Sequence, residues 1–364
     1  MNTVNTFAVD YRQYIDSQGK VVQPLPAFAR DLDELIKLYR LMTLIRLFDA
    51  KAIALQRTGV IGTYPSILGQ EAISVAVGSA MHTEDLFCPA YREYGALIQR
   101  GVKLSTLLAY WGGDERGNQV NNTLNFPFCL SVASQCLHAV GVATAFKLRR
   151  QARVVVAVLG DGGTSKGDFY EALNLAGVWK LPVVFVINNN QWAISLPRQR
   201  QTAAQTLAQK AIAAGFTGVQ VDGNDVVAMR DVVSTALLKA RQKGGPTLIE
   251  ALSYRLCDHT TADDASRYHD PEAFALAWQQ EPLMRLRHYL TQRGVWSTPH
   301  EAALKTNLHR VVTQAVAEYT NQTAPLPTSM FDDLYATLPL SLQAQRDDLL
   351  EHSQDGRDNL SRGH

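Results

Sequence analysis

The chain has 364 residues, which is long enough to bury a large hydrophobic core without disulfides or structural metals. Its 35 basic and 34 acidic residues leave a formal net charge of +1, so no global field recruits nucleic acid or an anionic membrane, and any phosphate binding must be local. The four cysteines lie far apart with no Cys-x-x-Cys pair, a pattern that fits neither a zinc ribbon nor a secreted disulfide framework.

The first segment, residues 1–32, is predicted to be an N-terminal extension. It starts polar and lacks the basic-then-apolar order of a secretory signal, and no apolar run in the chain approaches the ~20 residues that span a bilayer. We therefore expect a cytoplasmic protein. A helix is predicted from Asp33 to Arg57, with apolar side chains on more than one stripe. Such a helix needs cover on two sides, either in a deep core or from a partner subunit.

The next elements are shorter. A second helix is predicted from Gly69 through Met81, and residues 86–92 indicate a short buried strand that runs into a turn. Between Trp111 and Pro127 the chain is polar and rich in glycine and asparagine, which predicts a surface loop. A helix is expected to resume near Ser134 and to end near Arg150.

The centre of the chain has the clearest pattern. An apolar strand at 153–159, a glycine turn, a helix to about Lys180 and an apolar strand at 183–187 form a strand-helix-strand unit with parallel strands. Further strands are predicted at 219–221 and 247–250, alternating with helices at about 202–214 and 225–242. These elements predict an α/β domain, a doubly wound and mainly parallel sheet flanked by helices, over residues 33–270. Residues 271–364 are predicted to form a helical C-terminal extension with a frayed tail.

The glycine turn Gly160-Asp161-Gly162-Gly163 follows the first central strand, where open parallel sheets bind ligands. Glycines allow close approach of the backbone to a ligand, and free amides at a helix start suit a phosphate. The sequence does not match the dinucleotide-binding motif, because Ser165 occupies the position of its third glycine. It does not match a nucleotide phosphate-binding loop either, because no lysine follows Gly167. An ordinary nicotinamide dehydrogenase is therefore disfavoured.

Asp161 places an acid among these glycines, and an acid repels a diphosphate unless a cation lies between them. Mg2+ fits, because it is often shared between one or two protein oxygens and substrate phosphates. The next strand ends in Asn188-Asn189-Asn190, so its tip should lie beside the glycine turn and offer an amide oxygen as a second ligand.

Together, the stretches from Gly160 and from Val186 resemble the thiamine diphosphate motif, and more narrowly the alpha subunits of pyruvate and branched-chain 2-oxo acid dehydrogenases. The resemblance extends from about Asp33 to Leu290 and includes Gly69-Gln-Glu-Ala, Tyr91-Arg92-Glu93 and the segment 254–264. It implies a thiamine-diphosphate-binding fold with thiamine diphosphate and Mg2+ as cofactors.

The resemblance also implies a role for individual residues. The implied Mg2+ ligands are the side chains of Asp161 and Asn190 and the carbonyl of Trp192. The other residues implied at the cofactor are Tyr91, Arg92 and Arg255 at the diphosphate, Gly162 and Gly163 in the turn, Leu130 and Val132 at the aminopyrimidine through their backbone, and His259 near the diphosphate and the reacting carbon. His259 is the candidate catalytic residue, since imidazole can donate to phosphate or steer charge at the reaction centre.

The resemblance is weaker around the substrate. Tyr64, preceded by Thr63, stands where relatives often carry a phenylalanine in the substrate pocket, so we expect Tyr64 in that pocket. Thr260 occupies the position of a regulatory phosphoserine in some relatives, and we predict no such regulation here. Pyruvate is favoured as the substrate by the segments 163–171 and 258–264, while branched-chain 2-oxo acids and acetoin stay open.

One required group is missing from the sequence. Catalysis with thiamine needs a glutamate that protonates the aminopyrimidine, and no second sheet domain is present to carry it. The resemblance implies that a separate beta subunit supplies it, in an assembly of two alpha and two beta chains, and that the acyl unit passes to a lipoyl-bearing acyltransferase. A non-catalytic scaffold subunit is the alternative of a different class, and the intact set Asp161, Asn190, Arg92 and His259 argues against it.

Overall fold

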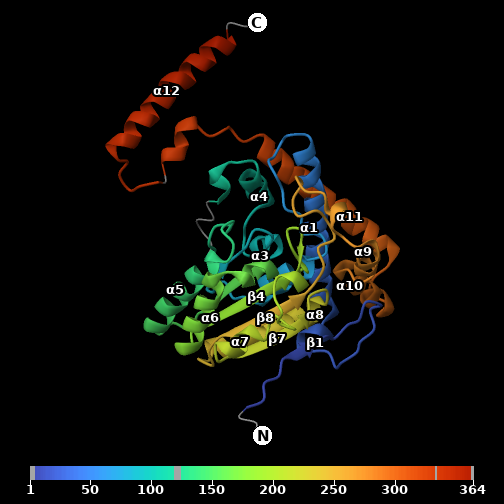
Figure 1. Ribbon diagram of the computed structural model, residues 1–364. Coiled ribbons are helices and arrows are strands. Elements are labelled where there is room, and N and C mark those ends of the chain that lie inside the picture. The colour runs from blue at the N-terminus through green and yellow to red at the C-terminus, as the bar shows by residue number, and fades with distance from the viewer. Residues whose placement is uncertain (1–4, 119–123, 333, 362–364) are drawn as a thin grey trace.

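The structure, a computed structural model, describes residues 5–118, 124–332 and 334–361, with side chains described to His352. A six-stranded parallel sheet in the order β1-β7-β8-β4-β3-β2 forms its centre, with helices on both faces (Figure 1). This confirms the predicted fold class. The strands of this sheet are β1 (Asp10–Arg12), β2 (Leu86–Cys88), β3 (Val155–Gly160), β4 (Val183–Asn189), β7 (Thr217–Asp222) and β8 (Thr247–Leu252).

The helices divide between the two faces of the sheet. One face is covered by α5 (Ser134–Leu148), α6 (Gly167–Val178) and α7 (Lys210–Ala213). The opposite face carries the larger core, built with α1 (Leu32–Arg57), α2 (Glu71–Ala80), α3 (Tyr94–Gln99), α4 (Leu104–Trp111), α8 (Val226–Arg241), α10 (Pro282–Gln292) and α11 (Thr298–Thr320). Because successive strand residues point to opposite faces, Val156 and Val158 enter this larger core while Val155 and Ala157 enter the other.

Helix α1 is covered by the chain itself. It packs against α2, α3, α10 and α11, and Leu35, Met42, Ile45 and Phe48 are fully buried between them. The wide apolar surface of this helix is therefore part of the core of the chain. Of the two alternatives, burial in a deep core or cover by a partner subunit, the structure shows the first.

The predicted helix at 202–214 is wrong over most of its length, because only α7 is helical. Backbone groups before α7 bond to side chains instead of to one another. The Glu250 carboxylate accepts the N–H groups of Leu207 and Ala208 at 2.8 and 3.0 Å, and the Arg198 guanidinium donates to the carbonyls of Ala204 and Gln205 at 2.5 and 2.7 Å. Such bonds compete with the helical ladder.

The sequence did not predict helices α3 and α4, and it did not predict three of the strands. Strand β1, from the N-terminal segment, pairs in parallel with β7 at the edge of the sheet. Strands β5 (Trp192–Ala193) and β6 (Leu196–Pro197) form a short hairpin directly after β4. The proposed division of the chain at residues 33 and 271 stays a prediction.

The C-terminal part is helical, with α9 (Pro271–Trp278), α10, α11 and α12 (Leu340–Ser361), the last of which extends away from the body in Figure 1. The frayed tail was expected over the part of the chain that includes the end of α12 and residues 362–364. Residues 362–364 lie outside the described residues. Residues 119–123 of the predicted surface loop lie outside them as well.

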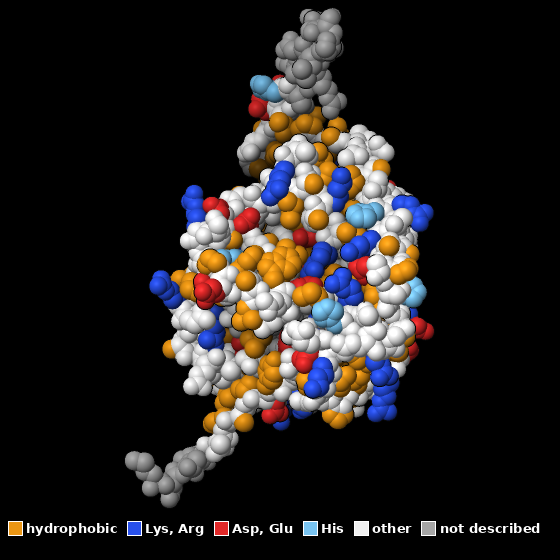
Figure 2. Space-filling view, turned by 90° about the vertical axis from the view of Figure 1, so that its right-hand side faces the viewer, with side chains coloured by type: hydrophobic (Ala, Val, Ile, Leu, Met, Phe, Trp, Pro, Cys, Tyr) orange, Lys and Arg blue, Asp and Glu red, His pale blue; other side chains and the backbone are white. Residues whose placement is uncertain are grey.

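The surface carries mixed charge. On the face shown in Figure 2, basic, acidic and hydrophobic side chains are interspersed, in keeping with the net charge of +1. None of the helices in the described part of the chain combines the length and the apolar character that a segment crossing a membrane needs.

Candidate active site

A cavity of about 560 Å³ opens at the carboxyl ends of β3 and β4. The sheet register pairs Gly160 with Asn188, which brings the glycine turn and the asparagine run side by side as the sequence predicted. Most of the expected site residues line this cavity, namely Tyr91, Arg92, Leu130, Val132, Asp161, Gly162, Gly163, Asn190, Trp192 and His259.

Asp161 begins a short 3₁₀ turn (Asp161–Ser165) and is only 1% exposed. One carboxylate oxygen, Oδ2, accepts a hydrogen bond from Gln201 Nε2 at 3.0 Å. The other, Oδ1, is buried without a hydrogen-bond partner among the described residues. Burial raises the pKa of this carboxyl group to about 6. A buried carboxylate oxygen that lacks a donor is the kind of atom that a cation satisfies.

Two glycines of the turn, Gly162 and Gly163, are closely packed. A Cβ atom on Gly162 would lie 2.7 Å from the Cβ of Ala193 in the β5–β6 hairpin, closer than two such atoms can approach. A Cβ atom on Gly163 would lie 3.2 Å from Leu159 Cδ1 and 3.5 Å from Val132 Cγ1. The hairpin and the glycine turn therefore close tightly on one wall of the cavity.

Asn190 is held at both ends of its amide. Its Oδ1 accepts the backbone N–H of Trp192 at 3.1 Å, and its Nδ2 donates to Gln70 Oε1 at 2.8 Å. No group of three or more His, Cys, Asp or Glu side chains suited to a metal occurs among the residues described. A metal beside Asp161 would therefore depend on amide and carbonyl oxygens, which suits a hard cation such as Mg2+.

Arg92 and His259 lie together on the cavity wall. The Arg92 guanidinium donates through Nη2 to the His259 carbonyl and approaches the ring nitrogen Nδ1 at 3.3 Å, while Arg255 Nη1 lies 3.4 Å from the same nitrogen. Arginine only donates, so Nδ1 is the acceptor and the ring proton sits on Nε2. Burial, with the charges of Arg92 and then Arg255, lowers the pKa of His259 to about 4. The imidazole is therefore neutral at pH 7.

The structure does not bring two of the expected residues to the cavity wall. Arg255 is fully buried, and its Nη2 donates to Tyr268 Oη at 2.6 Å and to the Ile194 carbonyl at 2.7 Å. Tyr64 is also fully buried, and its hydroxyl donates to Asp49 at 2.9 Å. Its neighbour Thr63 lines the cavity instead.

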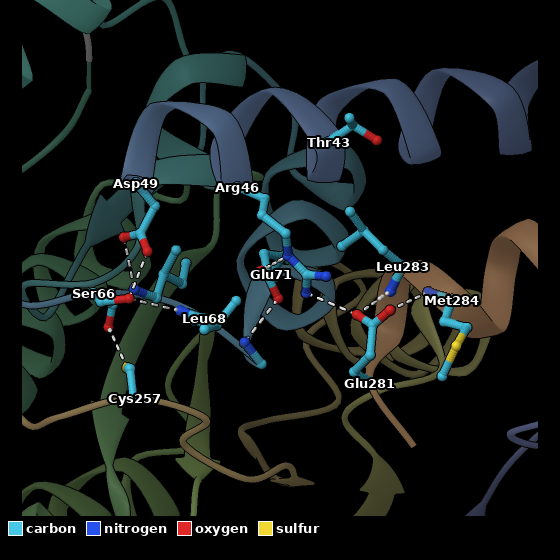
Figure 3. Close-up of polar contacts among 12 residues, drawn as sticks. Thr43, Arg46, Asp49, Ser66, Leu68, Glu71, Cys257, Glu281, Leu283 and Met284 are labelled. Atoms are coloured by element: carbon cyan, nitrogen blue, oxygen red, sulfur yellow. Dashed lines mark hydrogen bonds and ion pairs between the residues drawn. The ribbon is translucent and has the colours of Figure 1, made fainter. Parts of the chain in front are cut away.

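Sequence reasoning missed the support beneath Arg92. The Ser66 carbonyl accepts Arg92 Nε at 2.8 Å, and the Ser66 hydroxyl donates to Asp49 Oδ2 at 2.5 Å. Figure 3 shows Asp49 on α1 reaching down to Ser66, with Cys257 on the other side of the same residue. Burial raises the pKa of Asp49 to about 6. Asp49, an acid in the apolar part of α1 beyond its first turn, was the signal that could have revealed this contact.

Part of the rim of the cavity is apolar and exposed. Leu130 and Val132 line it and are 58% and 48% exposed, and Ile194 on the hairpin side is 57% exposed. Large apolar side chains exposed together at the mouth of a cavity are typical of a surface that another molecule covers.

The chain is similar to known proteins of one family. The family model described as "Dehydrogenase E1 component" matches residues 39–328. The 3-methyl-2-oxobutanoate dehydrogenase subunit alpha of Mycobacterium tuberculosis strain H37Rv is 40% identical over 325 residues, which cover 88% of this chain and 89% of that protein.

Two further relatives carry another substrate in their names. The pyruvate dehydrogenase E1 component subunit alpha of Bacillus subtilis is 36% identical over 335 residues, and that of Staphylococcus aureus strain COL is 37% identical over 336 residues. Each comparison covers 92% of this chain and 90% of the relative. The chain therefore belongs to the family of 2-oxo acid dehydrogenase E1 components, as an alpha subunit.

Proposed function

We propose that the chain is the alpha subunit of a pyruvate dehydrogenase, and that it holds the Mg2+ and diphosphate end of thiamine diphosphate. The observation that carries the proposal is the buried Oδ1 atom of Asp161, which has no hydrogen-bond partner in the described ranges and lines the same cavity as Asn190 at the carboxyl edge of a parallel sheet. A cation held between this atom and phosphate oxygens would compensate the buried charge and remove the repulsion between carboxylate and diphosphate.

The residues present fit such a cofactor. Asp161, Asn190 and the carbonyl of Trp192 would hold the metal, and Gly162 and Gly163, which line the cavity, would lie beside the phosphate oxygens. Tyr91 and Arg92 follow β2 and also line the cavity, and the Arg92 guanidinium lies 4.8 Å from the centre of the Tyr91 ring. This places a fixed positive charge next to the expected position of the diphosphate.

Thiamine diphosphate, when bound, supplies the carbon nucleophile for decarboxylation of a 2-oxo acid. The chain's own contribution is positioning and polarity. His259 is kept neutral with its proton on Nε2, so it donates one hydrogen bond and adds no positive charge beside the reacting carbon. Arg255 lies 3.4 Å from His259 Nδ1 and helps to orient this imidazole.

We propose that a beta subunit completes the site. Glu93 is the glutamate among the described lining residues, and it accepts the backbone N–H of Arg92 at 3.1 Å, so it belongs to the diphosphate end rather than the ring end. The exposed apolar rim at Leu130, Val132 and Ile194 suits cover by another chain. We also propose, on the resemblance to the family, an assembly of two alpha and two beta chains with a lipoyl-bearing acyltransferase as the acyl acceptor.

A branched-chain 2-oxo acid is the second candidate substrate, because a relative named for 3-methyl-2-oxobutanoate is 40% identical to the chain. The test is to assemble the chain with its beta subunit and to compare kcat/KM for pyruvate and for 3-methyl-2-oxobutanoate in a decarboxylation assay. We expect pyruvate to be preferred at least tenfold. A preference of that size for 3-methyl-2-oxobutanoate would replace the first candidate by the second.

A further inference from the structure

Gln70 is a buried polar residue on the cavity wall to which the expectations above give no role. It precedes α2, its side chain is 0% exposed, and it lines the cavity beside Asn188 and Asn190. Its amide nitrogen, Nε2, has no hydrogen-bond partner within the part of the chain that the structure describes. A buried amide N–H₂ without an acceptor is costly unless a ligand provides one.

The orientation of this amide is fixed by a chain of hydrogen bonds. The backbone N–H of Trp192 can only donate, so the group that it meets at 3.1 Å must be the Asn190 oxygen. The amide nitrogen of Asn190, Nδ2, then points toward Gln70. Because this nitrogen donates, the Gln70 atom that it contacts at 2.8 Å must be the oxygen Oε1. Asn188 Nδ2 donates to the same oxygen at 3.0 Å. The amide of Gln70 therefore has its oxygen committed to the asparagines and its nitrogen left for another acceptor.

The backbone around Gln70 is held from both sides. Gly69 has φ +88°, and a Cβ atom there would lie 2.4 Å from the Tyr254 carbonyl oxygen, so only glycine fits. Glu71 accepts the Gly69 N–H at 3.1 Å and pairs with Arg46 of α1 at 2.8 Å. Figure 3 shows this ion pair, and Arg46 also pairs with Glu281 at 2.7 Å. Gln70 is thus presented to the cavity by a rigid support.

We propose that Gln70 is a further residue that binds and positions the cofactor. Its Oε1 fixes Asn190 with the metal-binding oxygen turned away from Gln70, and its Nε2 donates a hydrogen bond to an anionic oxygen of the cofactor diphosphate. This inference rests on the proposed function, because it requires a diphosphate ligand in the cavity. A charged acceptor strengthens the bond and satisfies the buried amide at the same time.

The experiment measures binding of thiamine diphosphate, at saturating Mg2+, to the cofactor-stripped enzyme assembled with its beta subunit, by isothermal titration calorimetry. Gln70→Glu keeps an oxygen for the asparagines, removes the Nε2 donor and adds a negative charge. Gln70→Met has a similar length and no hydrogen-bonding group. Gln151→Glu, at an exposed position, is the matched control. Thermal unfolding and size-exclusion chromatography check folding and assembly, and one well-folded Gln70 variant is sufficient.

We expect the dissociation constant for thiamine diphosphate to rise at least tenfold in either Gln70 variant and to stay within twofold in the control. Inorganic pyrophosphate with Mg2+ is the second probe, and its binding should weaken by a similar factor because the contact is to the diphosphate. Unchanged binding of thiamine diphosphate in a folded Gln70 variant would overturn the inference alone. Weaker binding of thiamine diphosphate with unchanged binding of pyrophosphate would overturn the diphosphate contact. Failure of the unmodified enzyme to bind either probe would instead refute the proposed function.

Discussion

Replacing Asp161 with asparagine should stabilise the cofactor-free chain and remove its response to cofactor. In the folded protein, burial raises the pKa of this carboxyl from 3.8 to about 6. The folded state therefore binds the proton more tightly than the unfolded state, and stability falls as the pH rises from about 4 to about 6. The penalty is fully present at pH 7, and two pKa units correspond to about 3 kcal/mol.

Asparagine has nearly the same shape and carries no charge, so it should recover much of this free energy. For a chain of this length about 3 kcal/mol corresponds to a rise of about 4 °C in Tm. The assay is thermal unfolding at pH 7.5 after treatment with EDTA, repeated with Mg2+ and thiamine diphosphate. We expect the cofactor pair to raise the Tm of the unmodified protein and to leave that of Asp161→Asn unchanged.

Asp348→Asn is the control, because the side chain of Asp348 is 74% exposed on α12. It should change neither the Tm of the cofactor-free chain nor its response to the cofactor pair. The reasoning is refuted if Asp161→Asn lowers the Tm of the cofactor-free chain, or if its Tm still rises with Mg2+ and thiamine diphosphate as that of the unmodified protein does.

Two other predictions concern stability. Because the pKa of His259 is about 4 in the folded chain and its ordinary value is 6.5, the folded state binds fewer protons, and stability is lost as the pH falls from about 6.5 toward 4. His259→Asn should reduce this loss in urea unfolding measured across that range, and an unchanged pH dependence would contradict the assignment. Gly162→Ala should cost about 1–3 kcal/mol by overpacking against Ala193, whereas Gly160→Ala, with open space around it, should cost little. Equal unfolding free energies for the two variants would contradict this prediction, because they would mean that the β5–β6 hairpin shifts to accommodate the added methyl group.

The order of helices and strands around the site followed from the sequence because local patterns decided it. The apolar runs of β3 and β4 are buried on both sides, and a parallel sheet places their carboxyl ends together. The proximity of Asp161 and Asn190 could therefore be predicted without coordinates. Local patterns could not show that most of the segment 202–214 is not helical. Its backbone N–H groups at Leu207 and Ala208 bond to the carboxylate of Glu250, which lies far along the chain.

The site residues show the same limit. A motif match assigned Arg255 to the diphosphate and Tyr64 to the substrate pocket, but a motif match does not show how deeply a side chain is buried, and both side chains are fully buried. In the sequence, Gln70 was identified only as part of the segment Gly69-Gln-Glu-Ala that resembles the family, without a role of its own. Its unpartnered nitrogen depends on the direction of the Trp192 N–H, which only three-dimensional structure provides. Asp49 was hidden for the same reason, because its partner Ser66 is not on the same helix.

The most direct test of the central claim is decarboxylation of a 2-oxo acid, with thiamine diphosphate and Mg2+, by the chain alone and after co-expression with its beta subunit. The account predicts no turnover by the isolated chain and cofactor-dependent turnover by the assembly. Turnover by the isolated chain would contradict the claim that its site is completed by a partner, and an assembly that turns over no 2-oxo acid would contradict the proposed activity.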